Sequence, residues 1–102
     1  MFKKTIPHEA PKVQAAIDGR IMFSNEKAES ILLTLQPGES IPEHKNPFDV
    51  LFIGLKGTAT LAGGEQSYSL LPFETLYVTS EEMRSMQNHS QTEVRVMVVK
   101  LL

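Results

Sequence analysis

Hydrophobic and polar residues alternate along the chain in short runs, without the longer stripes of an amphipathic helix. No window keeps the i, i+3, i+4, i+7 spacing, and Pro or Gly interrupts the chain too often for long helices. Residues 11–17, with Ala15 and Ala16, are the one helical candidate. We therefore predict about nine or ten short strands in an all-β sandwich or barrel, with alternating strands and helices as the weaker alternative.

Turn residues separate the predicted strands. The strands cover 13–23, 29–36, 41–44, 48–55, 58–61, 67–71, 75–79, 84–88 and 93–102. Within the first of them, Asp18-Gly19 is predicted to be a hairpin turn, because glycine accepts a positive φ. Pro37-Gly38 is predicted to turn the chain after the second strand, and Gly63-Gly64 is the strongest hairpin signal.

The strand over 48–55 is apolar on both faces. Val50 and Phe52 share one face, and Leu51, Ile53 and Leu55 share the other. A small barrel has only one interior, so the second apolar face needs another sheet or another subunit to cover it. The last strand repeats this two-sided pattern. We therefore expect a homodimer with Leu51, Ile53 and Leu55 in its interface.

Length and composition limit the classes of function. The chain of 102 residues is expected to form one domain over 1–102, with 1–12, which contain two prolines, as an N-terminal arm or edge strand. A formal net charge of -2 spread without runs gives no footprint for nucleic acid. There is no cysteine, so a metal would have to be held by His, Asp, Glu or Asn.

The N-terminal segment does not resemble a secretion signal. Pro7, His8, Glu9 and Pro11 interrupt the sequence that follows two early lysines. Elsewhere the apolar runs are far shorter than the roughly 20 residues that span a bilayer. We expect a cytoplasmic protein with no membrane partner.

Three residues carry a recognisable pattern around the third and fourth predicted strands. Gly38, His44 and Gly57 match the spacing of G-x5-H-x-H-x3/4-E-x6-G, the first motif of the cupin superfamily, which this chain resembles over roughly 28–101. The resemblance implies a jelly-roll barrel, the double-stranded β-helix. Asn46 occupies the position of the second histidine, and Val50, or Leu51 at the longer spacing, that of the glutamate.

The second cupin motif, G-x5-P-x-G-x2-H-x3-N, can be laid without gaps on Phe73 to Asn88. Thr79 then stands for the proline, Glu81 for the glycine and Arg84 for the third histidine, and Asn88 alone keeps its residue type. The resemblance thus implies that His44, Asn46, Val50, Arg84 and Met86 point into the barrel.

This residue set is a poor metal site. One imidazole and a neutral amide bind a first-row metal weakly, and an inward arginine repels a divalent ion. We therefore expect no metal cofactor; if one binds, His44 is the ligand, assisted by His89 or His8. The alternative that stays open is a metal-dependent enzyme of dioxygenase, isomerase or decarboxylase type that uses His44.

Arg84 suggests a different chemistry, because it puts a fixed positive charge where a metal cupin holds its ion. With His44, Asn46 and Asn88 as hydrogen-bonding neighbours, such a cavity would favour a small carboxylate or another anion. The competing interpretation is that Arg84 pairs with Glu82 or Glu74 at the barrel mouth and binds nothing. We expect a homodimeric cupin whose cavity binds a small polar or anionic molecule, with nothing in the sequence that requires catalysis.

Overall fold

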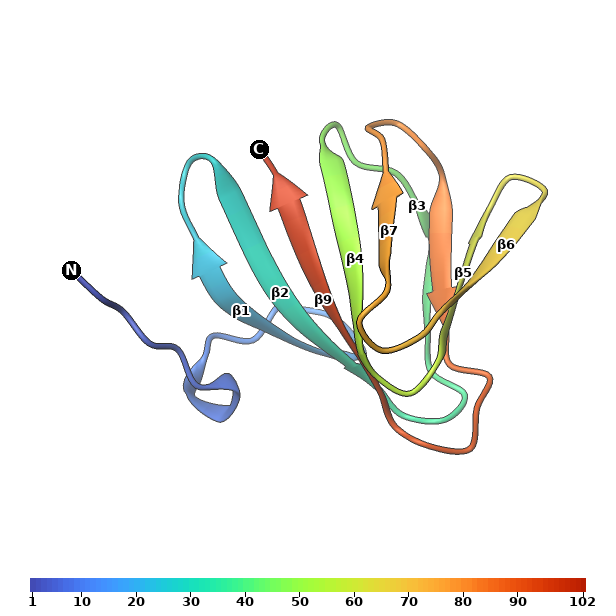
Figure 1. The fold of residues 1–102 in the computed structure, drawn as a ribbon, viewed down its shortest axis with the longest axis horizontal. Helices are drawn as coiled ribbons and strands as arrows, with labels where there is room; N and C mark the ends of the chain where they lie inside the picture. The colour runs from blue at the N-terminus through green and yellow to red at the C-terminus, as the bar shows by residue number, and fades with distance from the viewer.

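A computed structural model describes residues 1–102, and it consists of two antiparallel sheets (Figure 1). The five-stranded sheet contains, in spatial order, β1 (Asp18–Ser24), β2 (Ala28–Leu35), β9 (Val94–Leu101), β4 (Asp49–Lys56) and β7 (Thr75–Val78). The four-stranded sheet contains β3 (Ser40–His44), β8 (Arg84–Gln87), β5 (Ala59–Gly63) and β6 (Gln66–Leu70). The only helical segment is one 3-10 turn, η1 (Pro7–Glu9). The predicted all-β jelly roll is confirmed.

The core lies between the inner faces of the two sheets. Side chains alternate between the faces of a strand, so Val50 and Phe52 of β4 are buried while Leu51 and Ile53 on the other face are only half-buried. The buried core cluster consists of Ile17, Ile31, Leu33, Leu35, Val50, Phe52, Ala59, Leu61, Leu70, Met86, Val94, Val96 and Val98. Burial of these apolar side chains is the main source of the fold's stability.

The outer face of the five-stranded sheet carries a second apolar surface. Leu51 pairs with Val99, and Ile53 pairs with Met97, in the antiparallel register of β4 with β9. All four side chains are half-buried. Leu55 follows them with 38% exposure, next to a register irregularity between Gly54 and Lys56. The two-sided pattern of β4 therefore leaves apolar surface on the outside of this sheet.

The prediction of a turn at Asp18-Gly19 is wrong. Both residues lie inside β1, where Asp18 pairs with Thr34 and Gly19 with Leu33. A Cβ at Gly19 would lie 2.5 Å from Cγ2 of Val13. Glycine is needed here for space, and the turn instead occupies the residues before β1.

The other turns form close to where they were predicted. Gly38 has a φ of 85° between β2 and β3. Gly64 has a φ of 60° and forms with Glu65 the two-residue loop that joins β5 to β6. The helical candidate over 11–17 is wrong, because Lys12 forms an antiparallel bridge to Arg20 and no helix follows it.

Arg20 ties the N-terminal segment to β1. Its Nη1 donates to the carbonyl of Ala10 over 3.1 Å, and its Nε forms an ion pair with Asp18, also at 3.1 Å. Before η1 the chain extends away from the sheets, and Met1 and Phe2 are fully exposed (Figure 1). None of the helical structure has the length and apolarity needed to cross a membrane.

Candidate functional site

Arg84 is the one charged residue of the barrel that is fully buried. Burial alternates along β8, so that Arg84 and Met86 face the interior while Ser85 and Gln87 are only half-buried. Arg84 is 3% exposed. The alternation that places Met86 in the core therefore also places the guanidinium of Arg84 inside the barrel.

The guanidinium of Arg84 has only neutral partners. Its Nη1 donates to the backbone carbonyl of Glu82 over 2.9 Å. With the amide of Asn46 turned to satisfy both of its ends, the Asn46 oxygen accepts from Nη2 over 2.6 Å. Nε is buried and has no hydrogen-bond partner. Burial lowers the pKa of Arg84 from its ordinary value, because leaving water disfavours the charged form.

No carboxylate forms an ion pair with Arg84. The salt bridges of the structure all involve other residues. Glu82 contributes only its backbone carbonyl, and the carboxylate of Glu74 accepts from the backbone N–H of Leu71 over 2.8 Å. The competing interpretation, an ion pair between Arg84 and Glu82 or Glu74 at the barrel mouth, is therefore wrong.

His44 lies beside Arg84 but does not converge with it. The two residues are register partners across β3 and β8, after an irregularity between Ile41 and His44. The imidazole is exposed, and its Nδ1 lies 2.9 Å from the carbonyl oxygen of Pro42. Of the four predicted cavity residues, the structure thus brings Arg84 and Asn46 into contact and leaves His44 at the surface.

Asn88 is placed outside the cavity, in the connection between β8 and β9. Its Nδ2 donates to the carbonyls of Leu35 and Thr92 over 2.9 and 2.8 Å. Its Oδ1 accepts from the backbone N–H and the hydroxyl of Ser90 over 2.9 and 2.6 Å. The Asn88 side chain is 1% exposed, and these bonds use both the oxygen and the nitrogen of its amide to hold the loop. Neither atom is therefore left to bind a ligand.

The residues present do not fit a metal ion. No three His, Asp or Glu side chains converge anywhere in the structure. Val50, at the glutamate position of the first motif, is fully buried in the core. His8 lies in η1 and His89 in the loop after β8, and both are exposed, so neither joins His44 and Arg84. A metal ion at the motif position would be repelled by the Arg84 guanidinium and would find no set of ligands there.

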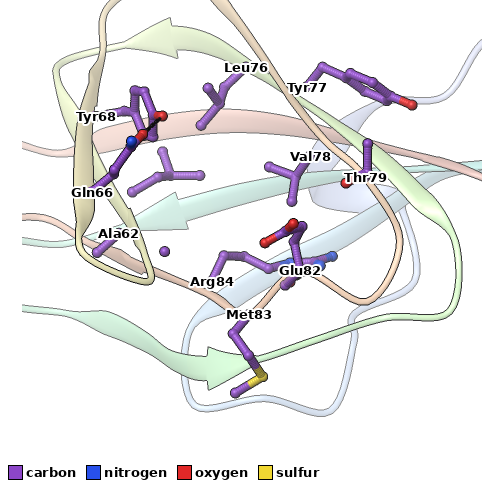
Figure 2. A pocket seen from close by; sticks show the side chains of 12 residues that line it. Ala62, Gln66, Tyr68, Leu76, Tyr77, Val78, Thr79, Glu82, Met83 and Arg84 are labelled. Atoms are coloured by element: carbon purple, nitrogen blue, oxygen red, sulfur yellow. Dashed lines mark hydrogen bonds between the residues drawn. The ribbon is translucent and has the colours of Figure 1, made fainter.

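A cavity of about 470 Å³ opens beside Arg84 (Figure 2). Its lining comes from β5, β6, β7, β8 and the segment before β8, and comprises Leu61, Ala62, Gly63, Gln66, Tyr68, Leu76, Tyr77, Val78, Thr79, Glu82, Met83 and Arg84. Phe52 belongs to the core, Phe48 packs against it, and Phe73 is 89% exposed. None of these three phenylalanines lines the cavity.

The sequence did not single out Gln66, Tyr68, Glu82 or Met83 as site residues. A usable signal lay in β6, where Gln66 and Tyr68 share a phase with the buried Leu70 and therefore face the same side of the strand. The all-polar run before Leu70 concealed that signal.

Comparisons with known proteins agree with this fold. A family profile described as "Cupin domain" matches residues 31–100. A search of curated proteins found no match. Among solved structures, a cupin superfamily protein from Desulfitobacterium hafniense is similar with a TM-score of 0.80 and 19% identity, covering 100% of this chain and 99% of that one.

Two further structures have names that include an activity. A predicted oxalate decarboxylase from Thermotoga maritima is similar with a TM-score of 0.86 and 18% identity, covering 98% of this chain and 99% of that one. The polyketide cyclase RemF from Streptomyces resistomycificus has a TM-score of 0.86 and 14% identity, with 99% of this chain and 80% of that chain covered. At such identities the likeness extends to the fold alone.

Proposed function

The chain belongs to the cupin domain family, and from this we propose that its barrel cavity binds a small polar or anionic molecule through Arg84 without a metal. Asn46 holds the guanidinium in place. The proposed function is ligand binding, and the proposal assigns no catalytic role to any residue of the cavity.

The observation that carries this proposal is a buried positive charge with an unused donor. Arg84 is 3% exposed, its Nε has no partner, and it lines a cavity. A buried charge without a counter-ion costs several kcal/mol. An anion in the cavity would offset that cost and, once the lining shifts to uncover Nε, accept its N–H through a hydrogen bond of the strong, charge-assisted kind.

Anion binding is tested by thermal unfolding in acetate and in chloride at equal ionic strength. We expect acetate to raise the midpoint of unfolding of the native protein and to have no specific effect on Arg84→Gln, which keeps a polar NH₂ donor but loses the charge. Elemental analysis of untagged protein accompanies it. Stoichiometric metal in the native protein, or an equal acetate effect in both proteins, would contradict the proposal.

We also propose that the outer face of the five-stranded sheet is covered by a second copy of this chain. Leu51, Ile53, Met97 and Val99 form two adjacent cross-strand pairs at the centre of that sheet, and Leu55 extends the surface. Two copies related by a two-fold axis can bury the same patch on each other. The resemblance to small cupins, which commonly dimerise through one sheet, also supports this arrangement.

Analytical ultracentrifugation tests the dimer. Ile53→Lys places a charge in the centre of the interface and is expected to give a monomer at concentrations where the native protein is dimeric. Phe73→Lys is the matched control, because Phe73 is an exposed apolar residue in the loop between β6 and β7, outside the pairs that β4 forms with β9. A native protein that sediments as a monomer would refute this assignment.

A further inference from the structure

We propose that the ligand is a small monocarboxylic acid with an apolar body of at least one ring, whose carboxylate binds Arg84 and whose far end lies toward Gln66 and Tyr68. The inference rests on the proposed anion site and narrows it to one class of molecule. It follows from the charges, the walls and the two ends of the cavity.

The charges of the lining favour a single negative charge. Arg84 is the only cationic residue in the lining, and Glu82 is the only anionic one. Figure 2 shows the carboxylate of Glu82 on the same side of the cavity as Arg84. The guanidinium can balance a ligand with one negative charge. A second negative charge on the ligand would be repelled by the Glu82 carboxylate, and the lining has no second cation to balance it. Phosphate dianions and dicarboxylates are therefore disfavoured.

The fixed geometry of the guanidinium favours a carboxylate. The Glu82 carbonyl and the Asn46 amide hold Nη1 and Nη2, so the plane of the group is set before a ligand arrives. Nε remains free within that plane. A planar carboxylate matches the planar array of N–H donors of arginine.

The walls of the cavity require more than a carboxylate. Leu61, Leu76, Val78 and Met83 give the lining a largely apolar character. The volume of about 470 Å³ lies within the range of small-molecule sites, far above the size of a formate or acetate ion. An apolar body attached to the carboxylate would remove the exposed surface of Leu76, Val78 and Met83 from water.

The far end of the cavity is polar. Tyr68 donates its hydroxyl proton to Oε1 of Gln66, and the pair lies across the cavity from Arg84 (Figure 2). This bond leaves the Tyr68 oxygen as an acceptor and the Gln66 amide nitrogen as a donor. A ring that carries a hydroxyl opposite its carboxylate can therefore use both ends of the site.

Calorimetric titration with benzoate, 4-hydroxybenzoate, benzamide, phthalate and phosphate tests this assignment at constant ionic strength. We expect benzoate to bind at least tenfold more tightly than benzamide, phthalate or phosphate, and 4-hydroxybenzoate to bind at least as tightly as benzoate. Equal binding of benzamide and benzoate would show that the charge is not recognised and would overturn the inference. Tighter binding of phosphate than of benzoate would also overturn it while leaving the anion site intact, and failure of every anion to bind would refute the anion site itself.

Glu82→Gln gives a second test that does not disturb the core, because Glu82 is exposed. Loss of its charge is expected to reduce the preference for benzoate over phthalate several-fold. Glu93→Gln is the matched control, since it removes the same charge from a residue outside the cavity lining and should leave the preference unchanged. An unchanged preference in Glu82→Gln would overturn the role of Glu82 in selecting a single charge.

Discussion

Phe73 and Glu81 are the only residues other than glycine with a positive φ, at 70° and 68°. They are separated by the same eight positions that separate the two glycines of the second cupin motif. The backbone thus keeps the left-handed geometry of both glycine positions although the side chains have changed. This agreement fixes the motif on the chain and places Arg84 at the position of its histidine.

Glycine at either position is expected to stabilise the protein. Phe73→Gly and Glu81→Gly remove left-handed strain, which outweighs the flexibility that glycine adds to the unfolded chain, for a net gain of about 0.5–1 kcal/mol each. Phe73 is 89% exposed, so little packing is lost. Chemical denaturation measures the change, and Ser80→Gly, at a neighbouring residue without a positive φ, should destabilise. Destabilisation by both Phe73→Gly and Glu81→Gly would contradict the assignment.

Replacement of Asn88 is expected to affect stability and leave ligand binding intact. Asn88→Ala removes the side-chain partner of the Leu35 carbonyl and of the Ser90 N–H and leaves the Thr92 carbonyl with only the Ser90 hydroxyl, at a cost of about 2–3 kcal/mol. The midpoint of unfolding should fall while the affinity for benzoate, measured below that midpoint, stays the same. A loss of affinity without a loss of stability would return Asn88 to the ligand site.

Glu93 is expected to make the stability of the fold sensitive to acid. Hydrogen bonds from Lys56 and Gln36, with the charges of Arg95 and Lys56, hold the pKa of Glu93 below its usual value of 4.5. Since the folded-state pKa is depressed, this stabilisation is present above the unfolded value and is lost as the pH falls through the folded value.

Thermal unfolding between pH 7 and pH 3 measures the effect of Glu93. The native protein should be more stable than Glu93→Gln at pH 7, and the difference should shrink below about pH 4.5. Glu26→Gln, which removes a carboxylate that forms no ion pair, is the control. A difference that stays constant down to pH 3 would show that the Glu93 charge is not responsible.

Metal binding is expected to appear only when the ligands are restored. Arg84→His combined with Asn46→His removes the repelling cation and supplies two imidazoles, and once His44 turns inward from the Pro42 carbonyl to complete the set, the protein should take up zinc or nickel on loading. Asn46→His alone keeps Arg84 and should remain free of metal. Elemental analysis distinguishes them, and equal loading of the two proteins would show that Arg84 does not control the site.

The fold could be predicted from the sequence because its signals are local. Gly38 and Gly64 adopt the positive φ that their turns require, and the alternation in β4 correctly separates Val50 and Phe52 from Leu51 and Ile53. Gly19 was misread because a glycine that makes room for Val13 looks the same in the sequence as a glycine in a turn.

The site was predictable only in part, because its contacts join distant segments. Residue type identified Arg84 and Asn46 as candidates for the site, and their side chains are in hydrogen-bond contact. Residue type also marked Asn88, but its partners Leu35 and Thr92 belong to a loop contact that no spacing reveals. His44 is exposed at the end of β3 although the irregular register makes it the partner of the buried Arg84, and residue type does not reveal this.

The most direct test of the Arg84 site is the NMR signal of its side-chain Nε–H during a titration with benzoate. Nε has no partner in the protein, so a bound carboxylate should change its proton shift markedly and saturably, and slow the exchange of that proton with water. An Nε–H signal that stays unchanged while benzoate binds elsewhere, or that does not respond to any anion, would contradict the proposal that Arg84 is the anion-binding residue of this cupin.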